Sequence, residues 1–195
     1  MGRMERSTRE IEIKLRFDSA AAARERLEGI GATESKPRQL EDNFVLDRED
    51  GSLKREDRVL RVRKTGGQAV LTLKVPVAGE HVHKVRDEYE TTIGDAATTL
   101  SLLGRLGFTP SWRYQKYRTG YALGDLSICI DETALGCYVE LEGPEDQIDG
   151  AARQLGFTTA EYVRASYGEL CRREAERRGL PAADMLIEGA ADSRP

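Results

Sequence analysis

The sequence predicts an α+β fold in which eight antiparallel strands form a closed or nearly closed β-barrel tunnel with helices packed outside. The first observation is Glu10-Ile-Glu-Ile-Lys14, whose strict alternation places Glu10, Glu12, Lys14 and Arg16 on one strand face. The second is that ionisable residues recur at alternate positions in five later segments, at residues 61–63, 72–74, 84–90, 116–118 and 138–142. One such strand would suit a solvated edge. A charged face repeated on six strands is expected if the sheet curls around a polar interior.

The first helix is predicted at residues 19–30. Ser19 is a suitable capping residue, the segment is rich in alanine, and Gly31 can end the helix. Strands are expected where apolar and polar residues then alternate, with turns at residues 49–51 and 65–67. The strands predicted in this part are residues 42–46, 59–63, 70–75 and 83–93.

A second helix is predicted at residues 95–106, where Leu100, Leu103 and Leu106 follow helical spacing and Gly107 provides the stop. Further strands are expected at residues 112–121, 126–131 and 137–141. Together with the N-terminal strand this makes eight, which is enough to close a barrel.

The C-terminal part is predicted to be helical. A third helix begins at Pro144 with acidic residues in its first turn and ends at Gly156. A longer amphipathic helix is expected at residues 159–177. Residues 8–180 are therefore expected to form a single catalytic domain. Residues 181–195, which are mostly alanine, glycine, aspartate and serine, are predicted to be a mobile tail.

Composition restricts the classes of function. A chain of 195 residues with 39% apolar content suits one domain. The net charge of −4 argues against a DNA-binding protein, which usually carries a basic excess. No apolar run approaches the roughly 20 residues of a membrane span. Residues 1–6 are not followed by the apolar core of a signal peptide. The sequence thus predicts a cytoplasmic protein without a membrane partner. Its three cysteines lack the spacing of a zinc site or a disulfide framework.

The mixture of charges in the predicted tunnel indicates a ligand. Carboxylate oxygens suit Mg²⁺ or Mn²⁺, whereas arginine and lysine suit phosphate oxygens. A neutral ligand would leave buried charges unpaired, which is costly. The composition therefore points to a polyphosphate chelated by a divalent metal.

Aromatic residues in the predicted strand 112–121 allow two interpretations. Trp112, Tyr114, Tyr117 and Tyr121 could stack on an adenine ring. Packing against the outer helices is the more frequent role of such residues in strands, and it is the role predicted here.

The chain resembles the CYTH superfamily, also called triphosphate tunnel metalloenzymes, in which class IV adenylate cyclases, thiamine triphosphatases and inorganic triphosphatases share an eight-stranded tunnel. Residues 10–14 match the family's ExExK signature. Further matches follow in the family's order at residues 60–63, 71–74, 86–90, 116–118, 131 and 136–142. The resemblance covers about residues 8–170, and residues 163–170 are similar to the class IV cyclase branch.

This resemblance implies roles for the charged residues. The metal, Mg²⁺ or Mn²⁺, would be held directly or through water by Glu10, Glu12, Asp131, Glu140 and Glu142, with support from Glu88 and Glu90. The triphosphate would be bound by Lys14, Arg61, Arg63, Lys74, Arg86, Lys116 and Arg118. Of these, the residues expected to act in catalysis are Lys14, Lys74, Lys116 and Arg118. Positioning and charge stabilisation are what phosphoryl transfer mainly requires.

Three functions remain open at the level of sequence. The first is a class IV-type adenylate cyclase that converts ATP to cyclic AMP and pyrophosphate. The second is an inorganic or other organic triphosphatase that hydrolyses a terminal phosphate of tripolyphosphate or another triphosphate. The third is a non-catalytic module that binds polyphosphate or nucleotide, although such a module would not need the carboxylates. A homodimer is compatible with each of them.

Residue 44 bears on the choice among these functions. Thiamine triphosphatases carry a tyrosine in the strand after the first helix, where it helps a lysine to activate water. The segment 42–47 is expected to place Phe44 at that position, and phenylalanine has no hydroxyl. The His-Phe-Phe sequence of one proteobacterial cyclase group is also missing from this segment.

Overall fold

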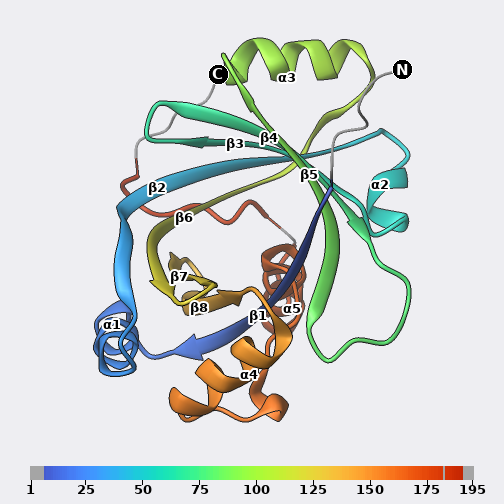
Figure 1. The fold of residues 1–195 in the computed structure, drawn as a ribbon. Coiled ribbons are helices and arrows are strands. Elements are labelled where there is room, and N and C mark those ends of the chain that lie inside the picture. Colours follow the sequence, from blue (N-terminus) through green and yellow to red (C-terminus); the bar gives the residue numbers. More distant parts are fainter. Residues whose placement is uncertain (1–6, 182, 191–195) are drawn as a thin grey trace, which may run out of the picture.

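The protein forms the predicted barrel with helices outside it (Figure 1). The computed structural model describes residues 7–181 and 183–190. Every strand pair is antiparallel, and the barrel closes in the order β1-β5-β4-β3-β2-β6-β7-β8. The strands are β1 (Thr8–Phe17), β2 (Thr33–Asp47), β3 (Val59–Thr65), β4 (Gln68–Pro76), β5 (Lys84–Ile93), β6 (Thr109–Leu123), β7 (Leu126–Thr133) and β8 (Gly136–Glu142). The predicted fold class is confirmed.

Strand β2 is much longer than the predicted segment 42–46. It spans 15 residues and pairs with β6 almost along its whole length. Its first half contains Pro37, and the pairing with β6 shifts register between Lys36 and Gln39. Proline cannot donate to a ladder and is tolerated at such irregularities. This irregular half lacks the alternation that identifies a strand in sequence.

The helices begin and end at residues suited to these positions. In α1 (Ala20–Gly29), the Ser19 hydroxyl accepts a hydrogen bond from the Ala22 amide at 3.1 Å. In α3 (Ala96–Arg105), Asp95 caps the first turn in the same way. Two more helices precede the C-terminal region, α2 (Ser52–Arg55), which was not predicted, and α4 (Glu145–Gln154). No helix in the described part of the chain is long and apolar enough to cross a membrane.

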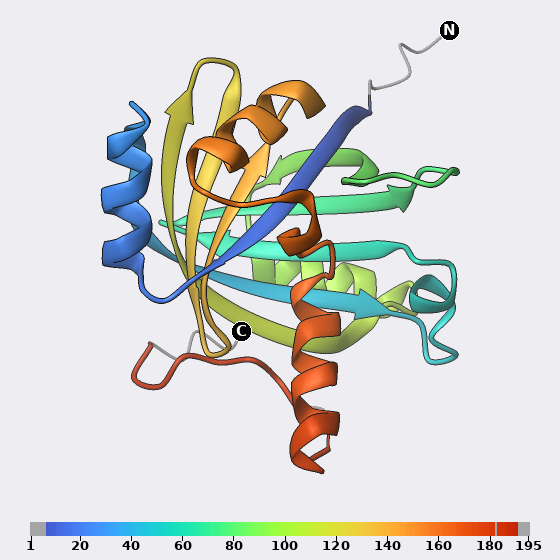
Figure 2. The same ribbon diagram turned by 90° about the horizontal axis from the view of Figure 1, so that it is seen from below.

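Helices α1, α3 and α4 lie on the outside of the barrel (Figure 2), and two of the apolar clusters form layers between these helices and the strands. In the larger layer, α1 and α4 cover the outer faces of β1, β7 and β8. Its fully buried members include Leu27, Ile128, Val139 and Ile148. In the smaller layer, α3 covers β2 and β3, with Val62 and Leu100 among its buried residues. The barrel therefore buries apolar side chains on its outside and leaves its inside to polar ones.

The predicted helix at residues 159–177 is interrupted. A 3₁₀ turn, η1 (Thr159–Glu161), is followed by extended residues and then by α5 (Tyr167–Arg178). The interruption arises because Val163 pairs with β1: its amide donates to the Lys14 carbonyl at 2.9 Å and its carbonyl accepts from the Lys14 amide at 3.1 Å. Ser166 and Glu169 then form a capping box that starts α5.

Part of the predicted tail lies against β6. The Met185 amide donates to the Arg113 carbonyl at 3.0 Å, and the Met185 carbonyl accepts from the Gln115 amide at 2.8 Å. The Met185 side chain is buried. Pairing between β6 and β7 begins only at Tyr117, so residues around Met185 occupy the strand edge that β7 leaves open. The rest of the tail, residues 182 and 191–195, lies outside the described residues.

Candidate active site inside the barrel

The barrel encloses a cavity of about 1390 Å³ to which all eight strands contribute. Alternation along each strand directs the predicted charged residues into it. The lining residues predicted from the sequence are Glu10, Glu12, Lys14, Arg61, Arg63, Lys74, Arg86, Glu88, Glu90, Lys116, Arg118, Glu140 and Glu142. Asp131 is fully buried and directly contacts two of them. The structure thus brings residues from distant parts of the sequence around one polar space.

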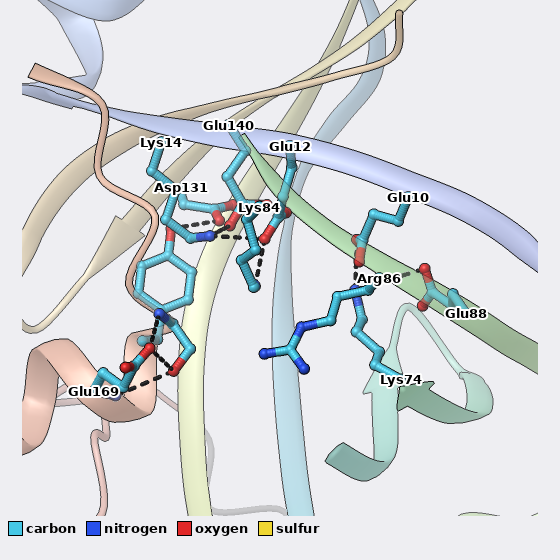
Figure 3. Close-up of polar contacts among 12 residues, drawn as sticks. Glu10, Glu12, Lys14, Lys74, Lys84, Arg86, Glu88, Asp131, Glu140 and Glu169 are labelled. Carbon is cyan, nitrogen blue, oxygen red and sulfur yellow. Dashed lines mark hydrogen bonds and ion pairs between the residues drawn. The ribbon is translucent and has the colours of Figure 1, made fainter. Parts of the chain in front are cut away.

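One group of charges surrounds Glu12 (Figure 3). Its Oε1 atom lies 3.1 Å from Lys14 Nζ and 2.6 Å from Lys84 Nζ, and Lys14 Nζ lies 3.3 Å from Glu140 Oε1. Burial would raise the pKa of Glu12, but Lys14 and Lys84 hold that pKa well below its usual range. Burial opposes the charge of Lys14 as well, but Glu12 and Glu140 raise its pKa. Glu12 and Lys14 therefore stay ionised around neutral pH.

A second group is centred on Asp131. Arg118 Nε donates to Oδ1 at 2.6 Å, and Lys116 Nζ donates to Oδ2 at 2.8 Å. Arg118 also contacts Glu140, and Lys116 lies 3.5 Å from Glu41. The family resemblance implies that Asp131 holds the metal. In the structure its oxygens accept hydrogen bonds from basic residues, so that it orients Lys116 and Arg118.

A third group contains Lys74 and Arg61. Lys74 Nζ lies 2.5 Å from Glu10 Oε1 and 3.6 Å from Glu88 Oε2 (Figure 3). Arg61 donates to the Tyr114 hydroxyl at 3.2 Å and lies 3.9 Å from Glu88. The Nε atom of Arg61 is buried and has no hydrogen-bond partner among the described residues. An anion in the cavity would supply an acceptor for that donor.

The remaining predicted residues lie toward the edges of this network. Arg63 pairs with Glu41 at 3.2 Å, and Glu90 accepts a hydrogen bond from Thr72 at 3.0 Å. Arg86 donates to both the carbonyl and the carboxylate of Asp57, a residue with a φ of 54° in the connection from α2 to β3. Arg86 is therefore placed at a mouth of the tunnel rather than among the buried bases.

The carboxylates Glu10, Glu12 and Glu142 suit a divalent cation in their chemistry. Within the described residues, no three acidic, histidine or cysteine side chains are already gathered as a metal site. Lysines pair with Glu10 and Glu12 instead. However, Glu10 Oε2 is buried without a hydrogen-bond partner among the described residues. Burial and the nearby charges of Glu10 and Glu12 raise the pKa of Glu142 to about 7. A proton thus partly offsets negative charge where a cation would fit.

The raised pKa of Glu142 gives a prediction for the protein without metal. Below its ordinary pKa of 4.5 the carboxyl is neutral in both folded and unfolded chains. As the pH rises toward about 7, only the unfolded chain ionises fully, so the folded state loses stability. Glu142→Gln, which stays neutral, should therefore match the wild type at low pH and be more stable above pH 7. Thermal unfolding in the presence of a chelator would measure this, and an equal difference at both pH values would contradict it.

Four residues of the site are given no role by the sequence analysis, although Lys84 lies in the alternating charged segment 84–90. Lys84 and Glu41 pair with tunnel residues, and Tyr114 and Tyr167 contribute hydroxyls to the tunnel. Alternation with Lys116 could have identified Tyr114, because residues two apart in a strand share a face. The prediction that Tyr114 packs against an outer helix holds for its ring, which clusters with Tyr167 and Leu170 of α5, whereas its hydroxyl faces the tunnel. No spacing rule connects Tyr167, on α5, to the barrel interior.

The Phe44 side chain lies on the other face of β2. It is buried in the apolar layer beneath α3, with Val62 and Leu100. The neighbours of Phe44 that line or contact the tunnel are Asn43, which accepts from Arg63, and Val45. This part of β2 therefore brings no hydroxyl into the tunnel, as expected. However, Phe44 does not occupy the place of the thiamine triphosphatase tyrosine, because its side chain points away from the tunnel.

Comparison with protein families agrees with this geometry. Residues 8–167 match the CYTH domain family. No curated protein sequence matches the chain.

Solved structures of similar fold span nearly the whole length of their own chains. A protein from Pyrococcus horikoshii is 27% identical, with a TM-score of 0.67 over 85% of this chain and 99% of its own. A candidate adenylate cyclase from Vibrio parahaemolyticus is 18% identical, with a TM-score of 0.72 over 85% and 98%. A Hippeastrum protein, named as a candidate adenylyl cyclase with a dominant triphosphatase activity, is 21% identical, with a TM-score of 0.57 over 88% and 97%. The Vibrio and Hippeastrum proteins have sequence identities so low that their similarity to this chain shows a shared fold only.

Proposed function

The chain belongs to the CYTH domain family, and on that premise we propose that it is a divalent-metal-dependent enzyme acting on a triphosphate bound inside the barrel. The observation that carries the proposal is the enclosed network in which lysines and arginines alternate with carboxylates around one cavity. A polyanion and a cation entering together could exchange partners with this network without leaving a buried charge alone. Neither partner would be as well accommodated by itself.

The residues best suited to hold the metal are Glu10, Glu12 and Glu142, because Glu10 has a free buried oxygen and Glu142 has no ion pair among the described residues. A divalent cation held there would neutralise phosphate charge and polarise a phosphoryl group. Glu140 and Asp131, for which the resemblance also implies a metal-binding role, lie against Arg118. Glu88, which lies beside Lys74, and Glu90, which lies beside Thr72, would support these residues.

The basic residues would bind and orient the triphosphate. Lys14, Lys116 and Arg118 converge on Asp131 and Glu140, so their side chains are held in place before an anion arrives. Such preorganised charges stabilise the developing negative charge of phosphoryl transfer without reorganisation. Lys74 and Arg61 would extend this path, with Arg63 and Arg86 farther out.

The reaction we rank first is the cyclisation of ATP, in which the 3′-hydroxyl attacks the α-phosphorus and pyrophosphate leaves. Its support is the similarity of residues 163–170 to the class IV cyclase branch. Hydrolysis of a triphosphate is the second candidate, and one observation favours it. The Tyr114 hydroxyl faces the tunnel beside Arg61. Burial would raise the pKa of Tyr114, but Arg61, Lys116 and Arg63 lower it. Such a hydroxyl could orient an attacking water molecule.

Product identity decides between the two reactions. Purified protein would be incubated with ATP, tripolyphosphate or thiamine triphosphate in the presence of Mg²⁺ or Mn²⁺. Cyclic AMP with pyrophosphate from ATP is the expected result. Orthophosphate without cyclic AMP, together with ADP from ATP or with pyrophosphate from tripolyphosphate, would establish hydrolysis instead. Binding of tripolyphosphate without any turnover would indicate the non-catalytic alternative, and absence of both binding and turnover would overturn the proposal.

A further inference from the structure

Tyr167, the first residue of α5, extends into the barrel from outside it. The residue is only 6% exposed, and its hydroxyl donates a 2.7 Å hydrogen bond to Asp131 Oδ2. Its backbone position is fixed on both sides. Val163 pairs with β1 before it, and the Ser166–Glu169 capping box starts the helix at this residue. The C-terminal region therefore delivers one aromatic side chain to a defined place in the tunnel.

The hydroxyl of Tyr167 completes the surroundings of Asp131. Oδ2 accepts from Lys116 Nζ at 2.8 Å and from Arg118 Nη2 at 2.6 Å, as well as from Tyr167. Oδ1 accepts from Arg118 Nε at 2.6 Å. Asp131 is fully buried, so water cannot take the place of a lost donor without a rearrangement. Rotation of this carboxylate would move Arg118 with it, because the two groups form a bidentate pair.

The ring of Tyr167 contacts two of the lysines. Lys14 Nζ lies 5.3 Å and Lys116 Nζ 5.2 Å from its centroid. Aromatic rings attract ammonium groups at such distances, and more strongly where water is excluded. The edge-on ring of Tyr138, at 5.7 Å, limits the movement of Tyr167. One ring thus restrains two cations that come from different strands.

We propose that Tyr167 is a positioning residue of the phosphate site. Its hydroxyl fixes Asp131 and through it Arg118, and its ring sets the places of Lys14 and Lys116. This inference rests on the proposed function, since it concerns how the bases are arranged for a triphosphate. It also makes α5 part of the site, whereas the sequence pattern describes that helix only as an outer packing element.

Tyr167→Phe tests the role of the hydroxyl, because it keeps the ring and the fold. Calorimetric titration should show tripolyphosphate affinity reduced about tenfold, the effect expected from a lost hydrogen bond to a charged group. The matched control is Tyr162→Phe. It removes another tyrosine hydroxyl that donates to a carboxylate, Asp149 at 2.9 Å, outside the tunnel. Tyr162→Phe should retain wild-type affinity for tripolyphosphate, even if its melting temperature falls as much as that of Tyr167→Phe. Equal affinity of Tyr167→Phe and wild type would overturn the inference.

A second measurement decides the inference without a ligand. Hydrogen exchange of the Arg118 Nε–H group, followed by NMR and assigned by its loss in Arg118→Lys, should be faster in Tyr167→Phe than in the wild type. It should be unchanged in Tyr162→Phe. If wild-type protein does not bind tripolyphosphate, the proposed function fails, yet this exchange rate still reports on positioning. Unchanged exchange in Tyr167→Phe would show that Asp131 and Arg118 are held without the hydroxyl.

Discussion

The substitution Glu12→Gln is expected to lower kcat/KM for the preferred triphosphate by about a hundredfold, the scale of loss seen when groups around a metal are altered. The variant removes one negative charge and nearly preserves shape. The concentration of Mg²⁺ or Mn²⁺ that gives half of the activity should rise as well. Folding should survive, because Lys14 still lies 3.3 Å from Glu140 and the Lys84 side chain keeps 16% of its surface exposed to solvent. Activity would be measured over a series of metal concentrations.

A matched control for this variant is Glu132→Gln. Glu132 pairs with Arg38 at an exposed position on the outside of the barrel, where an ion pair contributes little. It should leave both turnover and metal dependence unchanged. If Glu12→Gln also leaves the activating metal concentration unchanged, Glu12 does not hold the metal, and its role is confined to balancing Lys14 and Lys84.

The barrel and its charged interior could be predicted because one periodicity encodes both. A strand with apolar residues on both faces would be consistent with several folds. Here Ile13 and Leu15 pack outside while Glu12 and Lys14 point inside, and β3 and β8 repeat that division. The only arrangement that shields so many charged faces from apolar helices is a sheet closed on itself.

The C-terminal region could not be predicted in the same way. The helical pattern of residues 159–177 is real, but tertiary pairing overrides it at Val163, whose backbone pairs with β1. Likewise, Met185 is buried only because β7 leaves an edge of β6 open. Open edges are properties of the assembled barrel and have no signature in the segments that fill them.

The same distinction applies to the site. Alternation identifies which residues enter the tunnel but not which of them become partners. The family resemblance implies a metal-binding role for Asp131, yet its orientation toward Arg118 depends on the register between β6 and β7. Tyr167 reaches Asp131 across 36 positions in sequence, a contact that no local rule anticipates.

Removal of Arg118 should have the largest effect on triphosphate binding. Arg118→Ala is expected to weaken tripolyphosphate affinity on the order of a hundredfold or more, because two changes act together. A guanidinium that can bind phosphate oxygens is lost. Asp131 and Glu140, whose charge Arg118 compensates, are also left to repel the anion. Lys116 and Tyr167 still donate to Asp131, so this buried carboxylate keeps partners and the barrel should fold.

Calorimetric titration with tripolyphosphate would measure this loss, and two variants separate its causes. Arg177→Ala removes an exposed arginine that pairs with Glu174 on α5, and it should not change the affinity. Arg118→Lys restores the charge but cannot reproduce the bidentate contact with Asp131, so its affinity should fall between those of Arg118→Ala and wild type. Equal loss in the lysine and alanine variants would mean that geometry, not charge, governs binding. Wild-type affinity in Arg118→Ala would instead mean that the basic residues serve to balance the buried glutamates. Removal of Arg118, the most strongly paired of these bases, would then leave the binding free energy of tripolyphosphate unchanged.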